Sequence, residues 1–331
     1  METNSYVKQY PDLMVGKKIM YVHGFGSSAQ TGTVTRLRTL FPKATVVAED
    51  IPVHPEEGFR MLQEMAQREQ PDLIIGTSMC GKYAEMLYGF DRILINPAFQ
   101  IADTMGAHGL TGKQTFQNPR KDGVQEFIVT KSMVKEYRDM QEHCFARCDE
   151  DRQRVWGLFG DEDPLVHTYP LFMEHYEQGI WFHGEHRTND HVFMNSVVPV
   201  VRWIDDRQEQ RLRSVIYIAI DALRDARGAQ RSSAMKAFRL LLETYDIHIV
   251  APSPNYDATF IQEVQTWTAD AVTVPAWRHL VFTNRRDLLL GDYLIDLNPS
   301  SDFMGTHIPF GSDTFKTWED IIEFFSRLGG Q

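Results

Sequence analysis

The sequence predicts an α/β fold in two domains, each with a mostly parallel sheet covered by helices on its faces. Short apolar runs alternate with segments of helical period along the whole chain, which is typical of strands joined by crossover helices. The 331 residues exceed what one domain of ordinary size needs. The alternation is also interrupted once, after Trp203, which favours two separate sheets.

The predicted strands of the first domain are compact apolar runs, most of them bounded by turn residues. The segments between most of these runs have the helical period, so we expect helices there. In chain order the predicted strands are Lys18–Val22, Ala44–Val47, Leu73–Ile75, Ile93–Ile95, Val155–Phe159 and Ile180–Phe182.

A highly charged segment separates the two domains. Asp205–Arg213 has no apolar face, so it predicts the end of a helix followed by a linker, and we expect domains of residues 1–206 and 207–331. A second α/β series follows, with strands at Val215–Ile220, Ile247–Val250, His279–Phe282 and Tyr293–Ile295 and a closing helix at Thr317–Leu328.

The composition excludes several classes of protein. With 43% hydrophobic residues and 3 cysteines, the chain is neither disordered nor a disulfide scaffold. A net charge of −11 disfavours binding to a phosphate backbone, so we expect no nucleic-acid partner. No apolar run approaches the ~18 residues that span a bilayer, and the polar start is unlike a signal peptide. We therefore expect a cytoplasmic protein without a membrane partner.

The sharpest chemical signal is the segment Asp72–Gly81, in which a predicted strand runs through Gly76 into Ser78 and then into a predicted helix. This strand–turn–helix context is that of a nucleophile elbow, where a tight turn exposes a serine hydroxyl at the edge of the sheet. Small residues are needed two before and two after the serine. Gly76 meets that demand, whereas Cys80 stands where glycine is usual.

Two further segments supply the partners that a nucleophilic serine requires. The strand ending at Phe159 is followed by Asp163, which fits the acid position better than Asp161. His191 follows the last strand of the domain and is the predicted general base, with His186 as the alternative. The order Ser78, Asp163, His191 is the serine, acid, histidine order of the α/β-hydrolase fold. In such a triad, histidine takes the serine proton and the acid stabilises the imidazolium.

The first predicted strand is followed by His23-Gly24-Phe25-Gly26-Ser27-Ser28, which resembles the HG motif of α/β-hydrolases. Its glycines let the loop turn tightly, so we assign the oxyanion hole to the N–H groups of Phe25 and Met79. We expect substrate contacts from residues next to these motifs, namely His23, Gly24 and Lys82.

Together these motifs make residues ~17–204 resemble the small α/β-hydrolase-fold esterases of the YqiA/YcfP-like family. The resemblance rests on HGFGSS, GTSMCG, ILINPAF, GDEDPLV and NDHVF. It implies a serine hydrolase that cleaves a short ester or thioester without a cofactor. Cys80 and Lys82 depart from the Gly-Gly continuation that is usual after the elbow.

The insertion Gln100–Gln153 is expected to form a lid over the serine. Its first part is rich in glycine and polar residues, and Val134–Cys148 predicts a helix. Cys144 and Cys148 lie four residues apart beside His143, but no second cluster completes a metal site, and small cysteines on a helix face usually pack. We assign no metal.

The second domain resembles the 5'(3')-deoxyribonucleotidases of the haloacid-dehalogenase-like superfamily over residues ~214–328. The resemblance rests on VIYIAIDALRD, DIHIVAPSP, HLVFTNRRDLLLGDYLIDLNP and TWEDIIEFF. That family attacks phosphorus with an aspartate and uses Mg²⁺. The resemblance implies a vestigial phosphatase site, whose positions here are Ala219 for the nucleophile, Asp221, Ala251, Arg286, Asp292 and Asp296, with Leu297 in place of a metal-binding acid.

Loss of the nucleophile predicts that the second domain has no phosphatase activity. Its remaining roles are a scaffold, a binding module or a contact in a homo-oligomer. For the whole chain, the sequence leaves two alternatives to an esterase: a pseudoenzyme that binds without turnover, and amide hydrolysis or acyl transfer on the same triad.

Overall fold

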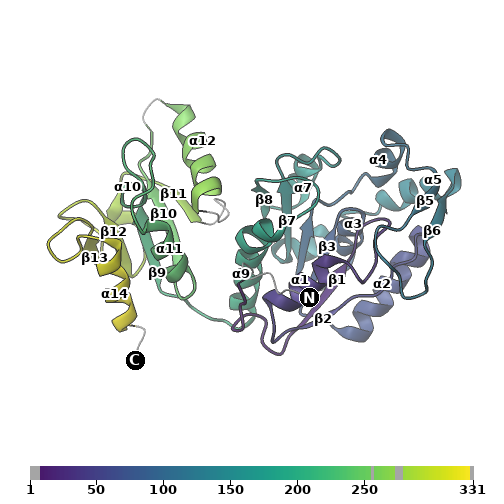
Figure 1. Cartoon of the computed structure of the whole chain (residues 1–331). Coiled ribbons are helices and arrows are strands. Elements are labelled where there is room, and N and C mark those ends of the chain that lie inside the picture. The colour runs from purple at the N-terminus through teal and green to yellow at the C-terminus, as the bar shows by residue number, and fades with distance from the viewer. Residues whose placement is uncertain (1–7, 255–256, 273–278, 329–331) are drawn as a thin grey trace. The chain divides into compact units, whose positions relative to one another are not determined.

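The computed structural model describes residues 8–254, 257–272 and 279–328. The chain divides into two compact units, Met1–Gln208 and Glu209–Gln331 (Figure 1). The division falls just after the expected boundary at residue 206.

The first unit is built on a six-stranded parallel sheet in the order β2-β1-β3-β4-β7-β8. From β1 the chain continues to β2 on one side of the sheet, whereas from β3 it continues to β4 on the other side. Loops that leave the carboxyl ends of β1 and β3 therefore diverge and open a crevice, which is where α/β sheets place their ligands. The strands are β1 Lys18–Val22, β2 Thr45–Val47, β3 Leu73–Thr77, β4 Arg92–Ile95, β7 Val155–Gly160 and β8 Gly179–Phe182.

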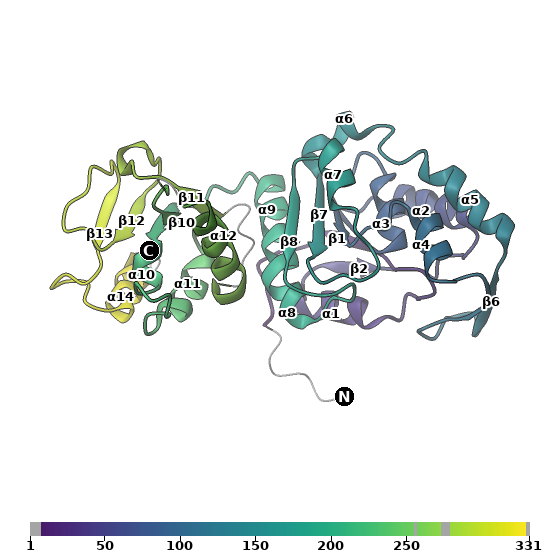
Figure 2. The ribbon, with the colours of Figure 1, turned by 90° about the horizontal axis from the view of Figure 1, so that it is seen from above.

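Helices cover both faces of this sheet (Figure 2), which is why its central strands are buried and mostly apolar. One face packs against α1 Gly32–Leu40, α8 Asp190–Val192 and α9 Val198–Gln208, the last two joined by a π-helical segment Phe193–Val197. The other face packs against α2 Pro55–Glu69, α3 Met79–Glu85 and α7 Tyr169–His175. The unit therefore has two separate hydrophobic cores, and α1 and α3 lie in different ones.

The insertion between β4 and β7 folds into helices and a hairpin, most of which lie together in Figure 1. We call it the lid. Its elements are α4 Ile101–Ala107, the antiparallel hairpin of β5 Gly112–Thr115 and β6 Glu126–Val129, α5 Lys131–Gln141 and α6 Cys148–Asp151.

The helix expected over Val134–Cys148 was placed wrongly. It is α5, and it ends at Gln141. Phe145, in the turn that follows, has φ 65°, a left-handed conformation that no helix continues through. Cys144 lies in the turn and Cys148 begins α6, so the two cysteines do not share a helix face.

The second unit has a five-stranded parallel sheet in the order β11-β10-β9-β12-β13. The four strands expected from the sequence are present, and β13 is an addition that the sequence reading missed. Helices cover one face and form the larger core, whereas a small cluster that includes Leu289 and Phe303 covers the other. The elements are β9 Val215–Ala219, α10 Ile220–Leu223, α11 Ala234–Leu242, β10 Asp246–Ala251, α12 Ala258–Trp267, β11 Leu280–Phe282, β12 Tyr293–Asp296, β13 Thr306–Pro309 and α14 Trp318–Leu328. Over the described part of the chain, no helix is both long and apolar enough to cross a bilayer.

Candidate active site

Ser78 lies in a strained turn between β3 and α3. Its backbone angles are φ 54° and ψ −129°, a region that costs a non-glycine residue about 1–3 kcal/mol. Three hydrogen bonds hold the turn: the Ser78 N–H donates to Ile95 O at 2.9 Å, and Ser78 O accepts from Gly81 N at 2.9 Å and Ala98 N at 3.0 Å. The strand–turn–helix context expected from the sequence is therefore present, with the serine at the carboxyl edge of the sheet.

Two glycines make the turn sterically feasible. A Cβ on Gly76 would lie 2.5 Å from Ala84 Cβ and 2.7 Å from Cys80 O, and a Cβ on Gly81 would lie 2.8 Å from Pro97 Cβ. At position 80, the atom that lies close to Gly76 is thus the backbone oxygen and not the side chain. This explains why Cys80 is tolerated there while Gly81 is required. Burial raises the pKa of the Cys80 thiol, so the thiol stays protonated and is not a competing nucleophile.

A hydrogen-bonded chain joins Ser78 to His186 and Asp163. His186 Nε2 lies 2.9 Å from Ser78 Oγ, and His186 Nδ1 lies 2.7 Å from Asp163 Oδ2. The three residues come from the ends of β3, β7 and β8, which meet at the same edge of the sheet. This geometry is that of a serine–histidine–acid triad.

The Asp163 carboxylate is fixed by further hydrogen bonds. Its side chain is fully buried, and its Oδ1 accepts the N–H groups of Leu165 at 2.8 Å and Val166 at 3.1 Å. Burial alone would raise the pKa of Asp163, but the hydrogen bonds from His186 and from these two amides outweigh it and lower the pKa. Asp163 is therefore ionised and accepts the proton on His186 Nδ1.

His191 was predicted as the general base, and the structure contradicts that choice in favour of His186. His191 is exposed in the short helix α8. The segment that contains it begins a helix, because the Asn189 side chain accepts the Val192 N–H at 2.9 Å as an N-cap, and Asp190 is ion-paired with Arg36. The Asn-Asp pair before an apolar run was a helix-start signal that could have directed the choice to His186.

The loop after β1 passes directly beside the serine. A Cβ on Gly24 would lie 3.3 Å from Ser78 Cβ, so only glycine fits there without displacement. Phe25 and Gly26 line the same cavity as Ser78 and His186. Met79 is the first residue of α3, and the first N–H groups of a helix have no partner within it. The two predicted oxyanion residues thus lie on segments that flank Ser78.

Of the three predicted substrate contacts, only Gly24 lines the cavity. The prediction was wrong for His23 and Lys82, because both side chains are buried in the protein. His23 Nε2 accepts the Ile51 N–H at 3.1 Å, and its Nδ1 donates to Gly24 O at 3.0 Å. Burial lowers the pKa of His23 to about 4, so a neutral imidazole fixes the start of the loop.

Lys82 is fully buried on α3, one turn beyond Ser78. Its Nζ has no hydrogen-bond partner and lies 4.8 Å from the ring centre of Tyr83 and 4.9 Å from that of Tyr137. Burial lowers the pKa of Lys82 to about 8. It is a core residue between α3 and the lid helix α5, and it does not reach the cavity.

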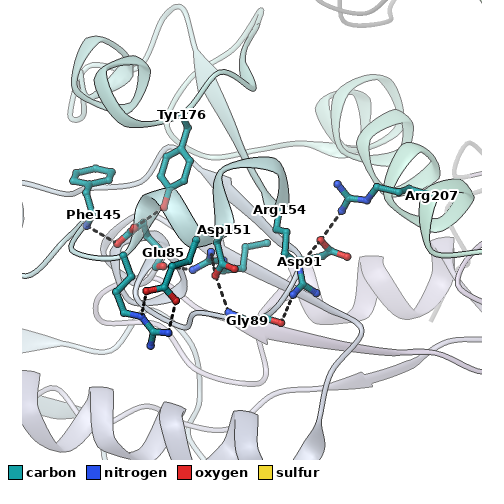
Figure 3. Close-up of polar contacts among 11 residues, drawn as sticks. Glu85, Gly89, Asp91, Phe145, Asp151, Arg154, Tyr176 and Arg207 are labelled. Atoms are coloured by element: carbon teal, nitrogen blue, oxygen red, sulfur yellow. Dashed lines mark hydrogen bonds and ion pairs between the residues drawn. The ribbon is translucent and has the colours of Figure 1, made fainter.

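The other end of α3 is anchored by a buried polar network (Figure 3). Glu85 accepts the Tyr176 hydroxyl at 2.7 Å and the Phe145 N–H at 3.1 Å, and burial raises its pKa. Arg92, at the start of β4, donates to Asp151 at 2.7 Å and also to the Glu85 carbonyl oxygen. The lid is thereby tied to the elbow helix and to the strand beside it.

The cavity beside the triad has a volume of about 500 Å³, within the range of small-molecule sites. Its lining is mixed in polarity. The side formed by β1 and α1 includes Tyr21, Thr31, Thr33 and Arg36. The lid side contributes apolar residues, among them Ile101, Leu110 and Phe127, together with polar ones, namely Thr104, His108, Gln114, Thr115, Gln117 and Asn118.

In the second unit, three predicted positions of the vestigial site meet at one edge of the sheet. Ala219, Ala251 and Asp296 end the adjacent parallel strands β9, β10 and β12. The Asp296 carboxylate is already paired, with His307 Nε2 at 2.9 Å and Arg286 Nε at 3.8 Å. In the described ranges, no cluster of three or more His, Cys, Asp or Glu residues could hold a metal ion.

Asp292 was predicted to belong to that site, but the structure places it elsewhere. It precedes β12, at the amino end of the strand, and its Oδ2 accepts the Val215 N–H at 2.7 Å. Asp292 and Asp296 therefore lie at opposite ends of β12, and Asp292 has a structural role. Asp221 is exposed on α10, just after β9.

Comparison with known proteins finds similar sequences for both halves. The model of UPF0227, an uncharacterised protein family, matches residues 18–195. Curated relatives include putative 5'(3')-deoxyribonucleotidases from Vibrio phage KVP40, 29% identical over 96 residues (28% of this chain and 56% of the relative), and from Staphylococcus aureus strain Mu50, 28% identical over 103 residues (28% and 57%). This chain spans little more than half the length of these relatives. Both resemblances predicted from the sequence are confirmed.

Three of the solved structures found to be similar to this chain are hydrolytic proteins by name. They are a monoacylglycerol lipase of Paleococcus ferrophilus (16% identity, 57% of this chain and 94% of that one, TM-score 0.40), Est1E of Butyrivibrio proteoclasticus (14%, 63% and 90%, TM-score 0.39) and the thioesterase domain of the curacin biosynthetic pathway (12%, 60% and 92%, TM-score 0.34).

Proposed function

This chain belongs to the UPF0227 family, and we propose that it is a serine hydrolase that cleaves a carboxylic ester or thioester of a small acyl substrate. The observation that supports this most directly is the chain of two hydrogen bonds from Ser78 through His186 to Asp163. The strained Ser78 backbone and the cavity beside it support the same reading, because strain of this kind gathers at functional sites.

The reaction follows from these positions. His186 Nε2 takes the proton of Ser78 Oγ as the oxygen attacks the carbonyl carbon, while Asp163 holds the Nδ1 proton and stabilises the imidazolium. The N–H groups of Phe25 and Met79 donate to the tetrahedral oxyanion. His186 then gives its proton to the departing alcohol or thiol, which leaves an acyl-Ser78 ester. Water attacks this ester with His186 again as the base, which releases the acid and restores the serine.

The mixed lining of the cavity supports a substrate with one apolar and one polar part. Its apolar residues, such as Ile101 and Phe127, fit a short hydrocarbon acyl group, and its polar residues, such as Arg36, fit a polar alcohol or thiol part. We propose that the second unit contributes no phosphatase chemistry, because alanine replaces the nucleophile at position 219, and that it serves as a scaffold or binding module.

A fluorophosphonate probe tests the proposal, since it forms a covalent bond only with an activated serine. The wild-type chain should be labelled at Ser78, the Ser78→Ala variant should not, and an esterase of known activity serves as the positive control. An unlabelled wild type beside a labelled control would contradict the hydrolase and favour a protein that binds without turnover. Aryl esters, thioesters and amides with matched acyl groups would then show which bond the triad cleaves.

A further inference from the structure

The loop between β5 and β6 of the lid lies across two loops of the reaction centre. We call residues 116–121 the strap and residues 24–28 the oxyanion loop. Resting on the proposed function, we propose that the strap is a positioning element. Gln117 and Asn118 hold the oxyanion loop in place, and Gln117 also ties it to the loop that carries His186.

The oxyanion loop has little of its own to define its shape. It contains Gly24 and Gly26, the latter with φ 65°, and the backbone hydrogen bond within it is Ser27 N–H to Gly24 O at 3.2 Å. Glycines permit many backbone conformations. An oxyanion donor, however, must be held at about 3 Å from the developing charge, and a misplacement of about 1 Å costs on the order of 10²-fold in rate.

The strap supplies the missing restraints immediately after Phe25. The Gln117 N–H donates to Gly26 O at 2.7 Å, and Asn118 Nδ2 donates to Ser27 Oγ at 2.9 Å. Ser28, which is fully buried, donates from its Oγ to Pro119 O at 2.6 Å. Three consecutive residues of the oxyanion loop are thus each bonded to the strap.

Two further contacts connect the strap to its surroundings. The Asp50 carboxylate accepts the N–H of Ala29 at 2.7 Å and the N–H of Lys121 at 2.7 Å, so it bridges the end of the oxyanion loop and the end of the strap. On the other side, Arg187 Nη2 donates to Gln117 Oε1 at 3.0 Å. Arg187 follows His186 directly, so Gln117 contacts the oxyanion loop through its backbone and the histidine loop through its side chain.

Four variants test whether Gln117 and Asn118 position the oxyanion loop or only stabilise the fold. Asn118→Ala removes the bond to Ser27, and Gln117→Ala removes the bond to Arg187. Gln117→Glu keeps an acceptor for Arg187 and is the conservative rescue. Lys113→Ala is the matched control, because Lys113 lies on the same hairpin with its side chain 67% exposed and pairs with the half-exposed Glu126 at 2.7 Å.

The measurements are kcat and KM for a short-acyl aryl ester, normalised to the number of active serines titrated by fluorophosphonate, together with the melting temperature. We expect Asn118→Ala and Gln117→Ala to lower kcat about tenfold or more, with KM changed less than threefold. Their melting temperatures should match that of Lys113→Ala, and Gln117→Glu should stay within threefold of wild type.

Three results for Asn118→Ala and Gln117→Ala would overturn the proposal. The first is a normalised kcat equal to that of Lys113→Ala, and the second is a rise in KM at constant kcat. The third is a loss of activity that is fully explained by a smaller number of active serines. A wild-type chain that neither labels nor turns over would instead refute the proposed function itself. The two failures are therefore distinguishable.

Discussion

Replacing Lys82 by methionine is expected to stabilise the first unit in a pH-dependent way. The two side chains have similar length and volume, so the substitution removes a buried charge without opening a cavity. Lys82 is fully buried and its Nζ has no hydrogen-bond partner. A charge in that environment is costly unless it is paired or neutralised.

The size of the effect follows from the pKa of Lys82, which burial lowers from 10.5 to about 8. At about 1.4 kcal/mol per pKa unit, this corresponds to a penalty of roughly 3 kcal/mol for the charged form. The faces of Tyr83 and Tyr137 offset part of it, by about 1 kcal/mol. At pH 7 the Lys82→Met variant should therefore be about 1–3 kcal/mol more stable than wild type.

Between about pH 8 and 10.5 the unfolded chain binds a proton on Lys82 that the folded chain does not. The free energy of unfolding of wild type therefore rises with pH across this window, relative to the variant. The penalty is fully present below pH 8 and is relieved as the pH rises, so the advantage of Lys82→Met should shrink from pH 8 to pH 10.

Urea unfolding at pH 7, 8, 9 and 10 measures this difference, with Lys113→Met as the control for removing an exposed lysine charge. Only the transition of the first unit should shift. Equal stability of wild type and Lys82→Met at pH 7 would refute the reasoning, as would a gap that stays constant from pH 7 to 10. Either result would mean that the ammonium is solvated in the folded protein.

Four other outcomes are expected. His186→Ala should lower kcat/KM by at least 10³-fold, whereas His191→Ala should leave it within twofold, and the reverse ranking would contradict the triad. Gly81→Ala should lower the melting temperature by several degrees, as measured by differential scanning calorimetry, because its Cβ would lie 2.8 Å from Pro97 Cβ. His23→Gln should lose less stability than wild type as the pH falls from 6.5 to 4, because the pKa of His23 is lowered to about 4 and unfolding of wild type takes up a proton in that range. If the free energies of unfolding of the two proteins fell in parallel with pH, His23 would not be neutral in the folded protein. In a phosphate-release assay with Mg²⁺ and a deoxynucleotide, the full chain should show no activity above that of Asp221→Asn, and a higher rate in wild type would overturn the assignment of a vestigial site.

The sheet strands and the serine turn could be predicted because both are encoded locally. A buried parallel strand needs an apolar run, and β1 was predicted with its correct bounds. The elbow needs glycine where its backbone is crowded. Gly76 lies against α3, and Gly81 lies against Pro97, which follows β4. Ser78 and Asp163 could be predicted to lie close together, since each follows a strand that ends at the same edge of the sheet.

The histidine could not be fixed in the same way, because two candidates follow β8 within a few residues. Their distinction depends on where α8 begins, and that is set by the Asn189 cap and the pairing of Asp190 with Arg36, a residue far away in the sequence. The lid hairpin was missed for a related reason. Both of its strands are largely exposed, so neither has the apolar alternation by which strands are recognised.

The charged residues on α3 could not be assigned a role from the local sequence pattern. All seven residues of this helix are buried, so a polar residue on it does not mark a solvent-facing or substrate-facing side. Lys82 and Glu85 lie one turn apart. The Glu85 carboxylate accepts hydrogen bonds from Phe145 and Tyr176, whereas the Lys82 Nζ donates none. The partners come from the lid and from α7, distant segments whose approach the local sequence does not encode. The contact that the sequence suggested between Lys82 and a substrate is therefore replaced by contacts with Tyr83 and Tyr137. For this reason, the pH dependence of stability, and not the KM for a substrate, is the property that Lys82 should control.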